Sequence, residues 1–158
     1  MFESGFWRKG QRINALPLHH SWPLNEQPKH FELGSILNSA ALDAAIPHSV
    51  GAVGPQHAGC WECFLSDNSL IWSGGVYDLF GLPREMTATR EAAVRMYCEH
   101  SRVKMEALRA HAIKHKRGFT LDIEIRPASG GERWVRLITA PVLNGNKVVK
   151  LHGLKIAL

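Results

Sequence analysis

The C-terminal forty residues constrain the fold most strongly, because polar and apolar side chains alternate there between turns. In residues 119–127 ("FTLDIEIRP"), Leu121, Ile123 and Ile125 fall on one face and charged residues fall on the other. The runs "RWVRLITAP" and "KVVKLHGLKIAL" follow, after Ser-Gly-Gly at 129–131 and Asn-Gly-Asn at 144–146. Because Asn-Gly between two alternating runs is a strong hairpin signal, we expect three consecutive antiparallel strands.

A second predicted hairpin precedes them, in "GCWECFL" from residue 59 and "LIWS" to residue 73, around a turn at 66–69. The sequence between the hairpins predicts short helices, then one long helix over "SRVKMEALRAHAIKHKRG", which Ser101 can cap and Gly118 can end. Strands grouped at both ends predict an α+β fold. We expect a five-stranded antiparallel sheet with short helices and one long helix packed on one face.

Residues 1–50 form a predicted N-terminal extension. Prolines interrupt its first part, and a short helix is expected at about 33–46, before Pro47 and a glycine-containing linker. The remaining residues, 57–158, suit one domain with a real core. The apolar side chains of the short helix need burial, so we expect the extension to cover the outer sheet face or to form a dimer contact; they are Ile36, Leu37, Leu42 and Ile46.

Composition and charge are those of an ordinary globular protein, with 45% apolar and 21% charged residues among 158. No apolar run approaches the roughly 20 residues that span a bilayer, and the start lacks a secretory signal, so we expect a cytoplasmic protein with reduced cysteines. Residues 1–50 are electrically balanced, so the whole net charge of +5 lies in 51–158. Six basic residues between Arg102 and Arg117 favour a solvated helix face, with nucleic-acid binding the lesser alternative.

Motifs spread over residues 57–156 resemble those of PAS (Per-ARNT-Sim) domains, of the subgroup found in bacterial sensor histidine kinases and diguanylate cyclases. The matching stretches are "GCWE" at 59–62, "WS" at 72–73, Tyr77 with "LFGLP" at 79–83, Ser101-Arg102, and the hairpin residues Glu124, Arg126, Gly131 and "RWV" at 133–135. Two features depart from the family pattern. The Asp of the family's Pro-x-Asp-Arg segment is absent, and the chain reaches Leu158 without the family's usual junction to an effector, which leaves a free-standing module or a fragment open.

The resemblance implies a non-catalytic sensory module of two-component-type signalling. It would sense a small ligand or relay a signal through protein contacts, as a homodimer or with a signalling partner; a ligand-free dimerisation or scaffold domain is the alternative. Candidate residues for the lining of a ligand cavity come from the inner sheet face and the helices opposite: Trp61, Cys63, Tyr77, Phe80, Met96, Leu108, Ile113, Leu121, Ile123, Val135, Leu137 and Val149. Whether they enclose a cavity or a solid core is open at this stage.

Cofactor signals are weak. Cys60 and Cys63 have Cys-x-x-Cys spacing, but residues three apart on a strand face opposite ways, so no metal site is expected. His111 and His115 lie one helical turn apart without a third ligand. Some PAS domains bind haem through a histidine near the long helix; His111 is the candidate here, and His100 and His115 suit less well. A haem-binding gas or redox sensor is therefore a further, lesser alternative. Flavin-binding relatives carry a reactive cysteine motif that this sequence lacks.

No enzyme is expected, because phosphate-loop and nucleophile-elbow motifs are missing and the carboxylates of the last strands should face outward. A nucleic-acid binder would instead need one continuous basic patch, formed by Arg102, Lys104, Arg109, Lys116 and Arg117.

Overall fold

The computed structural model describes residues 20–32 and 58–158. The expected helix at 33–46, with Ile36, Leu37, Leu42 and Ile46, lies outside these residues. In chain order the described elements are β1 (Ser21–Pro23), the 3-10 helix η2 (Leu24–Lys29), β2 (Ala58–Phe64), β3 (Leu70–Trp72), α3 (Gly74–Phe80), α4 (Arg90–Arg95), α5 (Glu99–His115), β4 (Arg117–Ile125), β5 (Arg133–Asn144) and β6 (Lys147–Ala157).

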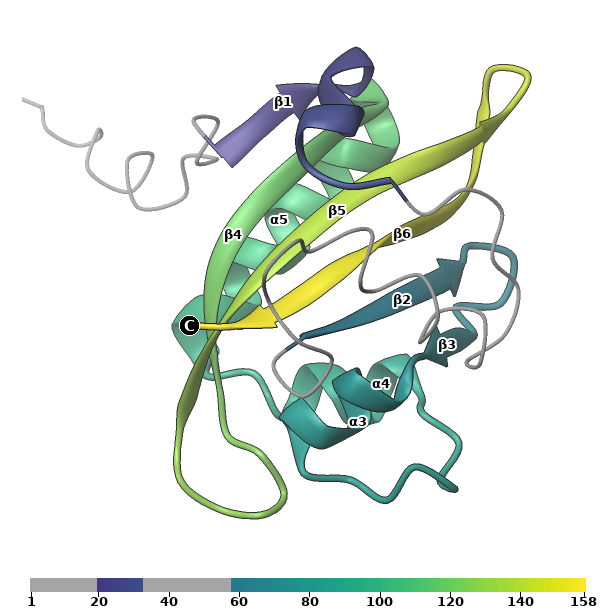
Figure 1. Ribbon diagram of the computed structural model, residues 1–158. Coiled ribbons are helices and arrows are strands. Elements are labelled where there is room, and N and C mark those ends of the chain that lie inside the picture. The colour runs from purple at the N-terminus through teal and green to yellow at the C-terminus, as the bar shows by residue number, and fades with distance from the viewer. Residues whose placement is uncertain (1–19, 33–57) are drawn as a thin grey trace, which may run out of the picture.

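The described strands form one antiparallel sheet in the order β1-β4-β5-β6-β2-β3 (Figure 1). The C-terminal strands β4, β5 and β6 are neighbours, and β6 also pairs with β2 of the first hairpin, as the α+β prediction requires. The sheet has six strands where the sequence predicted five. The additional strand is β1, which comes from the N-terminal extension and pairs with the start of β4, Trp22 opposite Gly118.

Helices cover one face of the sheet, here called the inner face. In Figure 1, α5 lies behind β4, whereas η2 crosses the opposite, outer face. The inner-face core joins aromatic side chains of β2, β3 and α3 to aliphatic ones of α5, β4 and β5. Trp72 stacks on Phe80 at 4.9 Å between ring centroids and meets Tyr77 edge-on at 5.2 Å.

The ends of α5 differ from the prediction. Cys98 occupies the N-cap, and Ser101 lies inside the helix, where its hydroxyl accepts a hydrogen bond of 2.8 Å from the Glu124 amide of β4. The helix ends at Lys116, which takes the left-handed conformation with φ of 57°. Gly118 instead lies within β4, opposite Trp22 of β1: a Cβ there would stand 2.2 Å from the Trp22 ring. Ser101 and Gly118 thus join α5 and β4 to their neighbours.

Close backbone approach explains two further glycines. A Cβ at Gly59 would lie 2.4 Å from the Val76 amide nitrogen, so α3 rests directly on β2. A Cβ at Gly153 would lie 1.7 Å from the carbonyl oxygen of Ile138, so β5 leaves no room for a side chain there. Gly59 is part of the motif that suggested the fold, and its role is helix–sheet contact.

The outer face carries a second apolar cluster. Trp22 and Phe31 of the N-terminal segment are buried against sheet residues, which are Ala58, Cys60, Ile138, Ala140 and Leu154. Trp22 also stacks on His30 at 4.0 Å and donates a hydrogen bond of 3.0 Å to the Thr120 hydroxyl. Residues 20–32 therefore cover part of the outer face. Among the described residues, no helix has the length and apolarity to cross a membrane.

Candidate functional site

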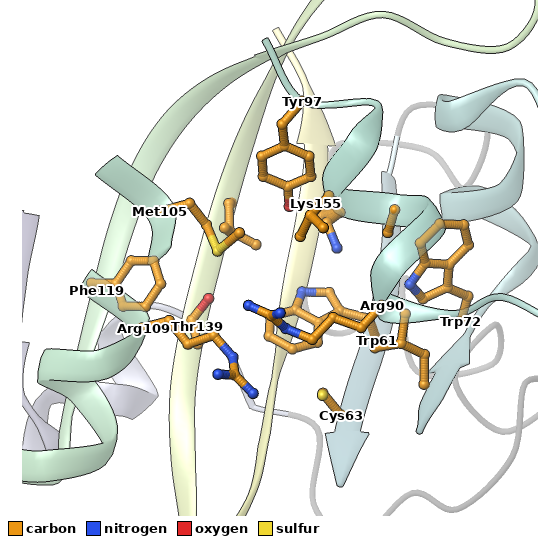
Figure 2. Close-up of a pocket in the computed structure, with 14 residues that line it drawn as sticks. Trp61, Cys63, Trp72, Arg90, Tyr97, Met105, Arg109, Phe119, Thr139 and Lys155 are labelled. Atoms are coloured by element: carbon orange, nitrogen blue, oxygen red, sulfur yellow. The ribbon is translucent and has the colours of Figure 1, made fainter. Parts of the chain in front are cut away.

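A small cavity of about 60 Å³ lies between the inner sheet face and helices α4 and α5 (Figure 2). Every sheet strand except β1 contributes to its wall. The lining residues are Trp61, Cys63, Leu70, Trp72, Arg90, Ala93, Val94, Tyr97, Met105, Arg109, Phe119, Leu137, Thr139 and Lys155.

Three of the sequence-predicted cavity residues line this space: Trp61, Cys63 and Leu137. Most of the others fill the surrounding core by packing on one another; these are Tyr77, Phe80, Leu108, Leu121, Ile123 and Val135, with Met96 and Ile113 at its margin. Val149 is displaced because β5 and β6 change register between Val142 and Leu143, so Val148 takes the core position instead. The structure therefore has a packed core and a small hollow beside it.

The polar residues of the cavity were not predicted. Lys155, Thr139, Arg90 and Arg109 all line it. Strand periodicity could have indicated Lys155, because Leu151, Gly153 and Lys155 are two apart on β6 and share a face. Lys155 was not predicted to face the core because lysine is rarely buried.

Lys155 is the least expected group of the inner face. Its side chain is only 5% exposed, and its ammonium nitrogen lies 4.8 Å from the Trp61 ring centroid and 5.6 Å from those of Trp72 and Phe80. Burial lowers the pKa of Lys155 to about 7, and the nearby Cys63 only partly opposes this shift. The aromatic rings give the ammonium ion cation–π contacts, each typically worth about 1 kcal/mol.

Two more polar groups of the cavity are buried without a hydrogen-bond partner, the indole Nε1 of Trp61 and the hydroxyl Oγ1 of Thr139. The two residues lie in one row across the sheet. Trp61 pairs with Gly153 of β6, and Gly153 pairs with Thr139 of β5. Because the central residue of this row has no side chain, none separates the indole from the hydroxyl. Buried polar atoms without partners are rare in folded proteins and call for an explanation.

Arginines mark the partly exposed side of the cavity. Arg90 of α4 forms an ion pair with Glu106 of α5, and Arg109 of α5 donates a hydrogen bond of 3.1 Å to Asn68 in the β2–β3 turn. Tyr97 closes another side, where burial, with a smaller effect of Glu106, raises the pKa of its hydroxyl. These contacts tie α4, α5 and the turn together around the mouth.

The outer face contains a separate buried polar group. Lys150 of β6 pairs with Glu62 of β2 at 3.0 Å, with Glu62 fully buried. His152, opposite Glu62 in register, lies 3.4 Å from the Gln27 amide and meets Phe31 edge-on. Burial, and secondarily Lys150, lowers the pKa of His152 to about 4, so this imidazole is neutral at ordinary pH.

The hairpin of β4 and β5 has a structural role. Trp134 lies opposite Glu124, and Arg136 forms a two-point ion pair with Asp122 at 2.8 and 3.1 Å. Arg133 instead reaches across to α3 and donates to the Leu79 carbonyl at 2.7 Å. The two arginines around the tryptophan thus fix the sheet register and hold the end of α3.

The other candidate ligands are dispersed. Cys60 belongs to the outer cluster and Cys63 to the inner core, so the two sulfurs lie on opposite faces. His111 is half-buried beside His115 and does not line the cavity. Cys98, Glu124 and Glu132 bring possible ligand atoms within 4.8 Å of one another, but Glu132 already lies 3.5 Å from Arg126, and burial raises the pKa of the Cys98 thiol. These contacts do not define a metal site.

The three arginines among the residues suggested for a basic patch have individual partners. Arg102 pairs with Glu99 at 2.8 Å, Arg109 bonds Asn68, and Arg117 donates to the Ser21 hydroxyl at 2.7 Å. The contacts of these arginines are therefore intramolecular.

The fold and the cavity are those of a small sensory domain: an open antiparallel sheet, a few short helices, one long helix and a hollow between them. The family model described as PAS fold matches residues 69–154, more than half of the sequence. The chain belongs to the PAS family.

Solved structures agree with the family assignment. An RNA-binding light-oxygen-voltage receptor is similar with a TM-score of 0.58 at 13% identity, over 65% of this chain and 29% of that one. The N-terminal domain of a diguanylate cyclase with a PAS/PAC sensor from Marinobacter aquaeolei has a TM-score of 0.58 at 14% identity, over 63% and 94%. A sensory box histidine kinase/response regulator from Burkholderia thailandensis has a TM-score of 0.56 at 15% identity, over 64% of this chain and 76% of that one. No curated protein matches.

Haem and flavin do not fit the cavity in this conformation. The similar structures include a light-oxygen-voltage domain examined with a flavin analogue. Pockets that enclose drug-sized ligands measure ~300 Å³ or more, several times the volume of about 60 Å³ found here. Trp61, Trp72 and Phe80 fill the neighbouring space. The histidine suggested for haem, His111, is not part of the lining.

Proposed function

We propose that this PAS domain senses a small molecule in the cavity between its sheet and helices α4 and α5. The observation that carries the proposal is that buried polar groups, Trp61 Nε1, Thr139 Oγ1 and the Lys155 ammonium, belong to residues that line the cavity. Burying a polar group without a partner costs free energy, typically ~1–3 kcal/mol in proteins. A ligand that offers hydrogen bonds would recover that cost.

Strand β6 provides a route for the signal. Lys155 faces the cavity, while its neighbours Leu154 and Ile156 belong to the outer-face cluster with Trp22 and Phe31. A ligand that binds one arrangement of β6 better would shift the population of the arrangement in which residues 20–32 rest on the outer face. The domain would then pass information by changing this docking surface.

Ligand binding can be tested with a cavity-filling variant. Ala93 of α4 lines the cavity, and the larger side chain of Ala93→Phe should occupy it. Ala107→Phe, at an exposed position of the neighbouring helix α5, is the matched control. We expect at least one compound from a set of anionic, cationic and neutral metabolites to raise the unfolding temperature of wild type and Ala107→Phe but not of Ala93→Phe. A compound that stabilises Ala93→Phe equally would contradict binding in this cavity.

Signal transmission can be measured by amide hydrogen exchange. With the ligand bound, exchange in residues 20–32 should change by at least about threefold relative to the free protein, because their contacts with β6 change. A ligand-dependent change confined to α4 and α5 would show binding without transmission to the outer face.

A second candidate, homodimerisation through the sheet, is favoured by one observation. Trp134 and Leu158 are 46% and 61% exposed, and the Leu158 amide donates a hydrogen bond of 3.1 Å to the Trp134 carbonyl, so two large apolar side chains emerge at the same place. Sedimentation should show a dimer that Trp134→Gln converts to monomer. The same mass for both proteins would exclude this contact.

A further inference from the structure

The charges around the cavity have one sign. Lys155, Arg90 and Arg109 line it, and no Asp or Glu is found among the described residues of the lining. The nearest ion-pair partner is Glu106, which is held by Arg90 at the edge. A cavity whose ionisable walls are basic favours a negatively charged occupant.

Lys155 strengthens this argument because of its position. It is nearly fully buried, its nitrogen lies among three aromatic rings, and no carboxylate of the described residues pairs with it. The other buried lysine of the same strand, Lys150, has Glu62 as its partner. Buried charges are normally paired, so Lys155 lacks the partner that its neighbour has.

The uncharged walls add two further requirements. The Trp61 N–H can only donate, and the Thr139 hydroxyl can also donate, so both suit an acceptor oxygen. Apolar side chains make up much of the remaining lining, among them Met105, Phe119 and Leu137. The occupant should therefore combine a group that accepts hydrogen bonds with a hydrocarbon part.

The volume limits the size. A cavity of about 60 Å³ has room for roughly four to six water-sized groups, since each needs ~10–15 Å³. Nucleotides, haem and flavin are too large for it.

We propose that the cavity binds a short-chain carboxylate, with its oxygens at Lys155, Trp61 and Thr139 and its carbon chain against Met105 and Phe119. This inference rests on the proposed sensing function and names the chemical class of the ligand. Inorganic anions lack the hydrocarbon that the apolar side chains of the lining would contact.

The first experiment compares isosteric probes on the full chain. Propionate and pyruvate should raise the unfolding temperature and saturate, while propionamide and inorganic phosphate at the same concentration and ionic strength should not. Calorimetric titration gives the affinities. Equal binding of propionamide would remove the need for a negative charge, and equal binding of phosphate would remove the need for a carbon chain; either result overturns the carboxylate assignment.

Variants then test the named groups. Lys155→Met preserves much of the side-chain volume and should weaken propionate binding at least tenfold, whereas Lys114→Met, at an exposed position of α5, should leave it unchanged. Thr139→Val is the second variant, because it removes a buried hydroxyl that has no partner in the free protein. It should leave the free protein as stable as wild type or more stable, yet lower propionate affinity several-fold. Unchanged affinity in both cavity variants would overturn the inference.

Failure of this inference can be separated from failure of the sensing proposal. If a neutral or cationic compound binds wild type but not Ala93→Phe, the cavity is a ligand site and only the carboxylate assignment is wrong. If no compound of any charge distinguishes wild type from Ala93→Phe, both proposals are wrong.

Discussion

The pKa of Lys155 depends on the groups that surround its side chain in the folded protein. The titratable groups that line the cavity with it come from several elements: Cys63 of β2, Arg90 of α4, Tyr97 before α5 and Arg109 of α5. None of them is a carboxylate, and the aromatic rings supply only weak compensation for lost water. The free protein therefore holds this amine partly deprotonated near neutral pH, since burial lowers its pKa to about 7.

This shift predicts a pH dependence of stability. The pKa of Lys155 is about 7 in the folded state against 10.5 for the unfolded chain, so between these values the unfolded chain binds the extra proton and folding stability rises with pH. Between pH 7 and pH 9.5, the free energy of unfolding measured in urea should rise for wild type relative to Lys155→Met. The Lys114→Met variant should show the same pH dependence as wild type. A constant difference between wild type and Lys155→Met across this range would show that Lys155 titrates normally.

The sequence indicated only part of this site. Trp61, Cys63 and Leu137 were predicted because they are apolar residues at inward positions of clear strands. Lys155 and Thr139 share the same periodicity, but a polar side chain at an inward position is ordinarily a reason to doubt the face assignment. The choice between hollow and solid core depends on side-chain packing, which residue type does not determine.

At the scale of elements, strands β2 and β6 are joined by the buried pair of Glu62 and Lys150. Removing one partner leaves the other charge buried, which typically costs about 3–5 kcal/mol, whereas replacing both by apolar residues is often nearly neutral. We expect Glu62→Leu and Lys150→Met each to lower the free energy of unfolding by about this amount and the double variant to recover most of it.

An exposed pair provides the control for that prediction. Arg136→Met breaks the surface ion pair with Asp122 and should cost under about 1 kcal/mol in the same urea titration. Additive losses in the Glu62 and Lys150 double variant would mean that the two charges do not interact.

Gly153 of β6 lies where the backbone of β5 leaves no room for a side chain. Because a Cβ would lie 1.7 Å from the Ile138 carbonyl oxygen, Gly153→Ala should force the strands apart and lower the free energy of unfolding by about 3 kcal/mol or more. Gly145→Ala is the comparison: φ is +64° and nothing lies within 4 Å, so only the ~1–2 kcal/mol of left-handed strain applies. Similar losses in chemical denaturation would refute the close contact.

The sequence predicted the order of the strands and helices better than it predicted the strands at the edges of the sheet. Alternation over long runs and the Asn-Gly turn predicted β4, β5 and β6, and the PAS resemblance placed the first hairpin beside them. Strand β1 was missed because its three residues, which include Pro23, have no periodicity of their own. Its strand conformation comes from pairing with β4. This contact joins distant parts of the sequence: Trp22 and Thr120, which are hydrogen-bonded, lie 98 residues apart.

At the scale of the whole molecule, residues 20–32 belong to the folded unit. Trp22 is buried among His30, Gly118 and Thr120, and large buried aromatic residues typically cost about 3–5 kcal/mol when truncated to alanine. Trp22→Ala should therefore lower global stability by about 3 kcal/mol, with Trp134→Ala, half-exposed on the sheet, costing under about 1 kcal/mol. Faster exchange of residues 20–32 without a loss of global stability would show that this segment is only attached to the domain.

Strand β6 has side chains on both faces of the sheet. Lys155 is separated from Leu154 and Ile156 by single peptide units, and pairing with both β2 and β5 holds the strand on each side. A strand held in this way cannot roll about its axis to bring Lys155 closer to a partner without turning its outward side chains through the same angle. Rotation of β6 as a rigid strand would then transmit a change in the cavity to residues 20–32. No chain of intervening side chains is required.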